Sequence, residues 1–265
     1  MKKKILIIGF GVMGQAIADR ISKDKKNFAV SVTDTKINQN SQIALKMGLL
    51  WESALTDNIQ NYDVIFVAVK PQDMPGLALS VKSYLNENTL LISIAAGLPL
   101  KKLMVFFGHK KIVRLMPNLG LCVGQGIAAW KSSGFLNESE KKMLRKILLT
   151  FTESFEVNKE SEIDAVTAIS GSGPAYFFYL AQSLEKTAKN LGFKPHQARL
   201  LVEKTFLAAG LLQQNFPYKA LIAKISSKKG TTEAALKILD KRGTGKIIRQ
   251  AVLAAYKRAG ELSNG

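Results

Sequence analysis

The sequence predicts an α/β protein in which a doubly wound, mostly parallel sheet domain is followed by an all-helical domain. Short apolar runs alternate with amphipathic helical segments in the first half, as crossover connections of a parallel sheet require. After Ile163 no segment has the character of a strand, and alanine-rich helical spacing continues to the end. We therefore expect one domain at residues 1–160 and a second at 161–265.

The first half contains six apolar runs with the length of buried strands. They lie at residues 4–8, 29–33, 64–69, 90–95, 112–116 and 126–130. Helical patterns begin between them near Gly14, Ser41, Asp73 and Pro99, and Asn137 opens a further one before a strand-like segment at 152–157. This order predicts a strand–helix alternation that winds on both faces of one sheet.

The second half contains five segments with helical spacing, at residues 176–191, 195–215, 218–225, 231–241 and 245–262. Their apolar faces exceed what one small bundle needs to bury. Excess apolar surface of this kind favours burial between subunits. We therefore expect the helical domain to be a dimerisation domain.

The composition excludes several classes of function. The chain has 38 Lys and Arg residues against 20 Asp and Glu residues, a net charge of +18. The lysines are scattered without interleaved aromatic residues, which favours a solvated surface over nucleic-acid binding. No apolar run approaches about 18 residues, so we expect no membrane span. With one cysteine, Cys122, and two histidines, expected at the surface, we expect no metal site and a cytoplasmic protein.

A glycine-rich turn follows the first apolar run directly. The stretch Gly9-Phe10-Gly11-Val12-Met13-Gly14 is a G-x-G-x-x-G pattern between a strand and a helix, with Ile8 immediately before it. The first glycine permits the tight turn, the second lets the backbone approach a pyrophosphate, and the third allows close packing of helix and strand. The pattern in this context predicts a Rossmann-like dinucleotide site.

The sequence leaves the choice of dinucleotide open. Asp34 follows Gly14 by 20 residues, where an acidic side chain binds a ribose 2′-hydroxyl and repels a 2′-phosphate. Thr35 and Lys36 beside it are suited instead to hydrogen-bonding and neutralising that phosphate. We therefore expect NADPH or NADH as the cofactor.

Three further strand ends carry candidate cofactor contacts, because strand ends at the carboxyl edge of a parallel sheet face the ligand crevice. Small residues at Ala95-Ala96-Gly97 suit a close approach of the nicotinamide, and Asn118 should project into the same crevice. Lys70, in the stretch Ala68-Val69-Lys70-Pro71, is either near the cofactor phosphates or a solvated lysine after a strand.

These residues together resemble the pyrroline-5-carboxylate reductase family over nearly the full length of the chain. The similarity comprises the glycine-rich turn, Ala68 to Gln72, Ala95 to Gly97, Arg114 to Asn118, and the unbroken stretch DAVTAISGSGPAY from Asp164 to Tyr176. The resemblance implies NAD(P)H-dependent reduction of a cyclic imine, 1-pyrroline-5-carboxylate, to L-proline, the final step of proline biosynthesis. It also implies a homodimer of interlocked C-terminal helices, which in some members assembles into a homodecamer.

The resemblance extends to a substrate loop, which in the family is similar to S-P-G-G-T-T. Ser227, Gly230, Thr231 and Thr232 match it, while Lys228 and Lys229 replace Pro-Gly. The match implies that Thr232 is the proton donor and that Ser227, Gly230 and Thr231 bind substrate. The backbone N–H groups of Gly230 and Thr231, at a helix start, suit a substrate carboxylate. The alternative for both threonines is a helix cap.

The stretch before the helical segments supplies two more candidates. Ser172 and Gly173 are expected near the substrate, although small residues before Pro174 also serve helix initiation.

Two other functions fit parts of the sequence. The β-hydroxyacid dehydrogenases also begin with a glycine-rich turn, but they carry a catalytic lysine on the long helix. Here no lysine follows the second glycine-rich stretch until Lys186. The other alternative is a dinucleotide-binding, reductase-like protein with an altered substrate or lost activity, which Lys228 and Lys229 suggest.

Overall fold

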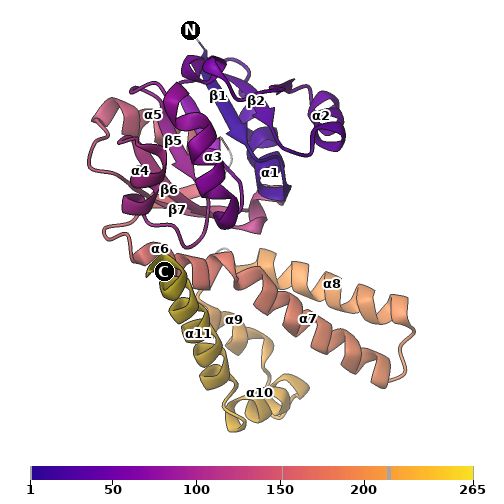
Figure 1. Ribbon diagram of the computed structural model, residues 1–265. Coiled ribbons are helices and arrows are strands. Elements are labelled where there is room, and N and C mark those ends of the chain that lie inside the picture. Colours follow the sequence, from indigo (N-terminus) through magenta and orange to yellow (C-terminus); the bar gives the residue numbers. More distant parts are fainter. Residues whose placement is uncertain (1, 151, 214–215, 265) are drawn as a thin grey trace. The chain divides into compact units, whose positions relative to one another are not determined.

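The computed structural model describes residues 2–150, 152–213 and 216–264. The chain forms two compact units (Figure 1). Residues 1–171 together with 255–265 make up the sheet unit, and residues 172–254 make up the helical unit. The last helix, α11 (Thr244–Asn264), begins in the helical unit and ends in the sheet unit. The expected boundary between residues 160 and 161 stays a prediction.

The sheet unit contains an eight-stranded sheet in the order β3-β2-β1-β4-β5-β6-β7-β8. Its strands are β1 (Lys3–Ile8), β2 (Phe28–Thr33), β3 (Leu50–Trp51), β4 (Val64–Val67), β5 (Leu90–Ser93), β6 (Ile112–Pro117), β7 (Ile127–Ser132) and β8 (Glu153–Glu156). Every neighbouring pair is parallel except β6 and β7. The mostly parallel, doubly wound sheet is therefore confirmed, and β3 is the one strand that the sequence patterns did not indicate.

Helices cover both faces of this sheet. One core joins the strands to α1 (Val12–Ser22), α2 (Ile37–Lys46) and α5 (Glu138–Leu148). The other core joins them to α3 (Met74–Val81) and α4 (Leu100–Phe107), which lie in front of the strands in Figure 1. The strands are apolar on both faces because both faces are buried.

The passage out of the sheet unit is a short helix continued by a wider turn. Helix α6 (Glu162–Val166) leads into a π-helical turn at Thr167–Gly171, and α7 (Gly173–Asn190) follows. Pro174 lies in the first turn of α7, where its missing N–H leaves no helical hydrogen bond unmade. Pro174 is thus the second residue of α7, one position later than the first helical position that the sequence indicated.

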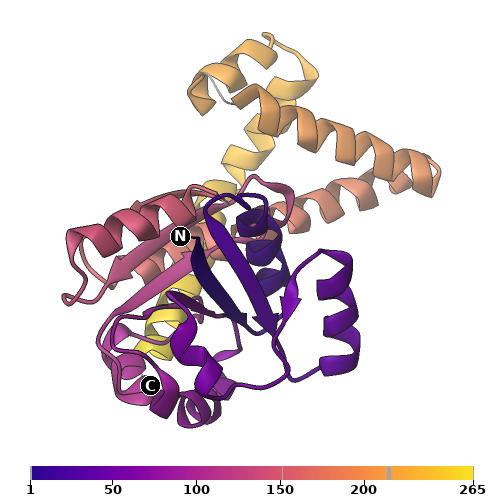
Figure 2. The same cartoon turned by 90° about the horizontal axis from the view of Figure 1, so that it is seen from above.

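The helical unit is built from α7 (Gly173–Asn190), α8 (Pro195–Leu212), α9 (Tyr218–Ile225), α10 (Thr231–Lys241) and the first part of α11. The predicted end of one helix at Asn215 lies outside the described residues. Figures 1 and 2 both show α7 and α8 side by side. Between them the rings of Phe177 and Phe206 pack edge to face, with their centroids 5.7 Å apart.

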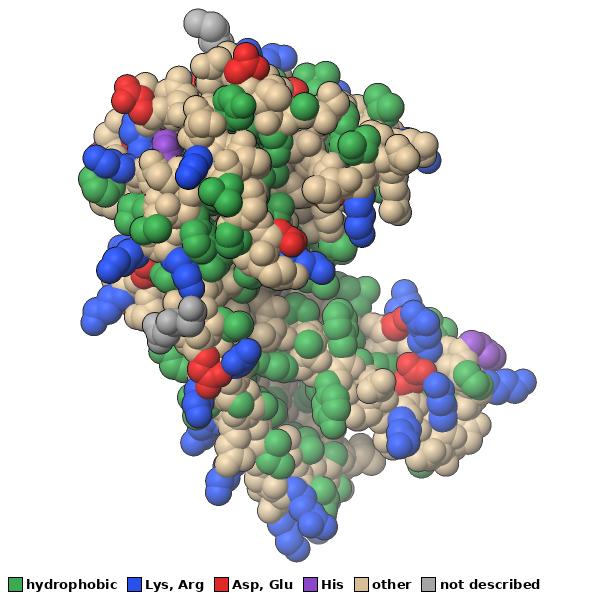
Figure 3. Space-filling view, in the orientation of Figure 1, with side chains coloured by type: hydrophobic (Ala, Val, Ile, Leu, Met, Phe, Trp, Pro, Cys, Tyr) green, Lys and Arg blue, Asp and Glu red, His purple; other side chains and the backbone are tan. Residues whose placement is uncertain are grey.

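One copy of the chain leaves much of the helical unit's apolar surface uncovered. On the face seen in Figure 3, hydrophobic side chains lie exposed among groups of lysine and arginine side chains. On α7 alone the exposed large hydrophobic residues are Phe177, Phe178, Tyr179, Leu180 and Leu184. Exposed apolar surface of this extent marks an interaction site. None of the described helices is long and apolar enough to cross a membrane.

Candidate functional site

The candidate cofactor residues follow five neighbouring strands at one edge of the sheet. Strands β2, β1, β4, β5 and β6 are adjacent and parallel, so their carboxyl ends share that edge. The chain order reverses at β1, which lies between β2 and β4. Ligands of open α/β sheets bind in the crevice at such a switch point. The topology therefore places the glycine-rich turn after β1 at the position where a dinucleotide would bind.

Each of the three glycines in this turn meets a different surrounding. Gly9 has φ of +97°, and a Cβ there would lie 2.7 Å from the carbonyl carbon of Ala68. A Cβ at Gly14 would lie 2.0 Å from the carbonyl oxygen of Gly9, inside the turn itself. Around Gly11 nothing lies within 4 Å of the corresponding position. Two of the glycines are therefore required by the chain's own packing, while the third leaves open space for a ligand.

The start of α1 is open as well. The helix begins at Val12, two residues earlier than the predicted start at Gly14, and no side chain caps it. The unpaired N–H groups of a first helical turn and the helix dipole favour a phosphate there. The side chains of Ile8 and Phe10 are buried in the two cores, so these two residues can offer a ligand only their backbone.

Asp34 is tied to the glycine-rich turn. Its Oδ2 accepts a hydrogen bond from the Phe10 N–H at 2.6 Å, and its Oδ1 accepts one from the Lys36 N–H at 2.8 Å. The Gly9 N–H donates to the Thr33 carbonyl at 2.9 Å beside them. The carboxylate therefore holds the turn and the end of β2 together, a contact that sequence spacing did not predict, and Thr35 next to it is exposed.

The remaining predicted cofactor residues follow β4, β5 and β6. The Ala68 N–H donates to the Ile8 carbonyl at 2.7 Å, which brings the turn after β4 against the glycine-rich turn. Lys70 is exposed, which fits both a lysine near the cofactor phosphates and a solvated lysine after a strand. Gly97 is buried and has φ of +72°. The Asn118 side chain is already engaged, because its Oδ1 accepts a hydrogen bond from the Ile127 N–H at 3.1 Å.

In the helical unit, the predicted substrate loop forms a tight turn between α9 and α10. The Gly230 N–H donates to the Ser227 carbonyl at 3.0 Å, and Lys229 is the one non-glycine residue with positive φ, +61°, among those described. Positive φ at the third position alone defines a type II turn, for which proline and glycine are the favoured central residues. Lys228 and Lys229 therefore occupy the two central positions without changing the type of turn that Pro-Gly favours.

The backbone of this turn corrects one expectation about the loop. Because the Gly230 N–H is engaged with Ser227, it is not free to bind a substrate carboxylate. Gly230 is also the N-cap of α10, so Thr231 and Thr232 are the first and second helical residues and neither occupies the capping position. A side chain at position 230 would meet the Ser227 hydroxyl, since a Cβ there would lie 2.4 Å from its Oγ.

A carboxylate of the protein itself lies at the start of α10. Glu233 accepts a hydrogen bond from the Lys229 N–H and forms an ion pair with Lys237 at 2.9 Å. Lys237 first, and the Lys229 N–H second, hold the pKa of Glu233 below its ordinary value. The loop is therefore anchored to the first turn of the helix that it precedes.

Replacing Lys229 by glycine should stabilise the protein by about 1 kcal/mol, because a side chain in the left-handed region is strained and glycine is not. The matched control is Lys228→Gly, since Lys228 has no positive φ and glycine there adds only chain entropy to the unfolded state. Urea denaturation of both variants measures the difference. Equal midpoints for the two variants would show that Lys229 carries no strain.

Ser172 and Gly173 stand at the start of α7. Ser172 is the residue before the helix and its side chain does not cap it, while Gly173 is buried. The preceding Gly171 packs against β6, because a Cβ there would lie 2.9 Å from the Met116 Cε. The small residues thus serve the packing of this passage, and a role of Ser172 or Gly173 in substrate binding stays a prediction.

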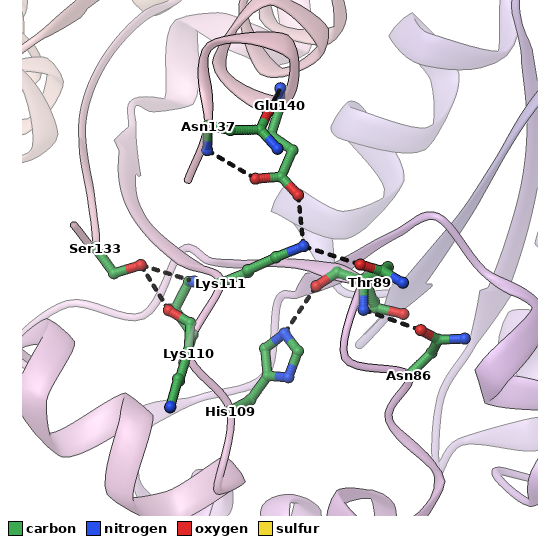
Figure 4. A network of polar contacts seen from close by, with 10 residues as sticks. Asn86, Thr89, His109, Lys110, Lys111, Ser133, Asn137 and Glu140 are labelled. Carbon is green, nitrogen blue, oxygen red and sulfur yellow. Dashed lines mark hydrogen bonds and ion pairs between the residues drawn. The ribbon is translucent and has the colours of Figure 1, made fainter. Parts of the chain in front are cut away.

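A basic hollow of about 550 Å³ lies at the opposite edge of the sheet, between the segments that precede β5 and β6. Several polar groups in and beside it are bound to one another (Figure 4). Lys111 pairs with Glu140 at 2.7 Å and contacts Asn88 at 3.1 Å. The His109 Nε2 donates to the Thr89 carbonyl at 2.7 Å, an acceptor that assigns the ring proton to Nε2. We interpret these contacts as a structural cross-link between the loops that line the hollow.

The expectation that His109 lies at the surface is wrong. The residue is 7% exposed, and desolvation lowers the pKa of His109 below its ordinary value because burial disfavours the charged form. His196, in contrast, is exposed in the described chain. Among the described residues no group of three or more His, Cys, Asp or Glu side chains is placed to hold a metal ion.

Comparisons with known proteins agree with this architecture. Residues 160–262 match a family model described as pyrroline-5-carboxylate reductase dimerisation, and residues 4–97 match one described as NADP oxidoreductase, coenzyme F420-dependent. The chain is 33% identical over 262 residues to pyrroline-5-carboxylate reductase from Aquifex aeolicus, covering 98% of this chain and 97% of that protein. It is 30% identical to the enzyme from Pseudomonas aeruginosa, covering 98% and 97%.

Two solved structures are similar along the whole chain. A pyrroline-5-carboxylate reductase from Coxiella burnetii has a TM-score of 0.89 at 29% identity and covers 99% of both chains. The Plasmodium falciparum pyrroline carboxylate reductase, solved with NADP bound, has a TM-score of 0.84 at 28% identity and covers 98% of both. Together with the identities over almost the full length, these similarities show that the chain belongs to the pyrroline-5-carboxylate reductase family.

Proposed function

We propose that the protein reduces 1-pyrroline-5-carboxylate to L-proline with NADPH or NADH, the final step of proline biosynthesis. The observation that carries the proposal is the glycine-rich turn at the switch point of the sheet, open at Gly11 and followed by the uncapped start of α1. Membership in the pyrroline-5-carboxylate reductase family supplies the substrate. The expected place of action is the cytoplasm.

The residues present suit a dinucleotide. The backbone at Gly11 and the first N–H groups of α1 would hold the pyrophosphate, and Asp34 lies where the adenosine ribose is bound in such sites. The small residues from Ala95 to Gly97 would leave room for the nicotinamide. When bound, the reduced nicotinamide supplies a hydride to the imine carbon.

The protein's part in the reaction is to orient the imine and to manage one proton. Hydride addition to the carbon of the C=N bond leaves a negative nitrogen unless that nitrogen is protonated, and the product is the cyclic secondary amine. We assign the proton to the Thr232 hydroxyl, relayed from water because a threonine alone is a poor acid. The Thr231 and Thr232 N–H groups lie in the unpaired first turn of α10 and suit the substrate carboxylate.

A homodimer formed through the helical unit follows from its uncovered apolar faces and from the match of residues 160–262 to the dimerisation model. Burial of such faces between two copies removes apolar area from water, which is the main driving force of association. Light scattering on the purified protein measures the mass and distinguishes the dimer from a homodecamer, the larger assembly that the family resemblance implies.

The test of the proposed function is a turnover assay with pyrroline-5-carboxylate and each dinucleotide, followed by loss of reduced-nicotinamide absorbance. Proline must appear in step with cofactor oxidation. Dinucleotide binding without turnover on either cofactor would instead favour a reductase-like protein with an altered substrate or lost activity. The type II turn at Lys228 and Lys229, the type that Pro-Gly favours, supports the reductase.

The variant Thr232→Ala should lower kcat by about tenfold to a hundredfold, within the usual range for loss of a proton-transfer group. The dissociation constant for the dinucleotide should stay unchanged, because Thr232 belongs to the helical unit and the proposed cofactor contacts belong to the sheet unit. Thr232→Ser keeps the hydroxyl and should retain most of the activity. A fully active Thr232→Ala enzyme would remove Thr232 from the mechanism.

A further inference from the structure

The sheet unit contains a buried arginine that the dinucleotide site does not use directly. Arg114, in the middle of β6, is 2% exposed. Its Nη2 donates to the Asp164 Oδ1 at 2.7 Å and its Nη1 to the Glu160 Oε1 at 3.2 Å. Its Nε has no hydrogen-bond partner among the described residues. The two carboxylates therefore set the orientation of the guanidinium even though one donor is left unpaired.

The last turn of α11 joins this network. The Ser263 hydroxyl donates to the Asp164 Oδ1 at 2.9 Å and accepts from the Arg114 Nη2 at 3.3 Å. The preceding residue, Leu262, packs directly on Gly97, where a Cβ would lie 2.6 Å from the Leu262 Cβ. Leu262 and Ser263 both lie in the stretch 255–265, which belongs to the sheet unit. One side of the Ala95–Gly97 turn is thus built by the end of the chain.

The second guanidinium nitrogen of Arg114, Nη1, is linked to the residues that follow the Ala95–Gly97 turn. The Glu160 Oε1 that binds the Arg114 Nη1 also accepts a hydrogen bond from the Leu100 N–H at 2.7 Å. Leu100 is the first residue of α4 and follows the Ala95–Gly97 turn after two residues. A single side chain therefore acts on both ends of the segment 97–100.

We infer that Arg114 is a positioning residue for the dinucleotide: through Ser263 and Glu160 it clamps the segment that carries the proposed nicotinamide contacts. The inference rests on the proposed function, because the Ala95–Gly97 turn is assigned to the cofactor there. The Arg114 side chain reaches this segment through Ser263 and Glu160, and Asp164 holds both Arg114 and Ser263. The effect of losing the clamp should be weaker cofactor binding and a more mobile 94–100 segment.

The informative variant is Ser263→Ala, because it removes one link of the clamp while leaving the Arg114–Asp164 ion pair intact. Its matched control is Ser133→Ala, since the Ser133 hydroxyl also makes two hydrogen bonds, with the Lys110 carbonyl and the Ile112 N–H, but at the opposite edge of the sheet. Ser263→Ala should raise the dissociation constant for the dinucleotide by about threefold to tenfold. Ser133→Ala should leave that constant unchanged.

A third variant tests the Arg114 guanidinium, which binds both carboxylates. Arg114→Lys keeps the positive charge but cannot bind two carboxylates with a planar fork, so it should weaken the dinucleotide more than Ser263→Ala does. Hydrogen exchange of the 94–100 segment, measured without cofactor, should be faster in Ser263→Ala and Arg114→Lys and unchanged in Ser133→Ala. A loss of global stability alone would instead move the thermal midpoints of Ser263→Ala and Ser133→Ala together.

The inference fails if Ser263→Ala binds dinucleotide as tightly as Ser133→Ala and its 94–100 segment exchanges at the wild-type rate. Failure of the proposed function has a different signature. In that case the wild-type protein shows no turnover of pyrroline-5-carboxylate, while the exchange measurement still reports whether Arg114 and Ser263 hold the segment, since it needs neither substrate nor cofactor.

Discussion

Gly14→Ala should destroy dinucleotide binding and destabilise the sheet unit, whereas Gly11→Ala should affect binding alone. A methyl group at Gly14 would lie 2.0 Å from the carbonyl oxygen of Gly9, so the turn and the start of α1 must move apart. Overpacking of this kind costs about 1–3 kcal/mol of folding free energy. At Gly11 the same methyl group meets nothing within 4 Å, so the fold has room for it.

The two glycine variants therefore separate folding from binding. Gly11→Ala should keep its unfolding free energy within about 1 kcal/mol of wild type, the usual effect of alanine at a helix N-cap. It should weaken the dinucleotide by about tenfold or more, because the methyl group occupies the space where the pyrophosphate approaches the backbone. Thermal melting and fluorescence titration with reduced dinucleotide measure the two quantities. Unchanged affinity in Gly11→Ala would place the pyrophosphate elsewhere.

Asp34→Asn should shift the preference between the two dinucleotides toward the phosphorylated one. A carboxylate at this position repels a 2′-phosphate, and asparagine removes the charge while keeping the shape of the side chain. The amide oxygen can still accept from the Phe10 N–H, which keeps the link between the glycine-rich turn and β2. The exposed Lys36 N–H, which loses its partner, can bind water instead.

The ratio of the dissociation constants for NADPH and NADH should fall by about tenfold in Asp34→Asn, equivalent to about 1.4 kcal/mol. Titrating each dinucleotide into the wild-type protein and the variant measures the ratio directly. Thr35→Ala is the control, because this neighbouring residue is exposed and carries no charge. If both constants change by the same factor, Asp34 acts on the turn and takes no part in discrimination.

Much of the fold follows from periodicity, because the buried strands are continuous apolar runs and the glycine pattern lies between a strand and a helix. The short β3 could not be predicted in this way, since a strand of two residues shows no hydrophobic periodicity. The burial of His109 could not be predicted for another reason. The Thr89 carbonyl that binds its ring is 20 residues away in the sequence and comes from a different loop. A polar residue can be buried wherever the fold supplies such a partner.

In the candidate site, too, local sequence patterns predict positions but not the contacts between residues far apart in the sequence. The spacing from Gly14 to Asp34 indicates the ribose position, but not that the Asp34 carboxylate is already bonded to the Phe10 N–H. The partners of Arg114 are separated from it by 50 residues for Asp164 and by 149 for Ser263, so no local pattern reveals them. At Lys229, residue preference argues against the left-handed conformation that the turn nevertheless adopts.

The return of α11 to the sheet unit also bears on the order in which the protein folds. Residues 255–265 complete a unit whose other 171 residues come first in the chain. Domains generally form as units during synthesis, with the N-terminal one first. In this protein the sheet unit therefore lacks one of its segments until α11 has been translated. A ribosome stalled within α11 would therefore hold a dinucleotide domain that is almost entirely synthesised and still unfinished.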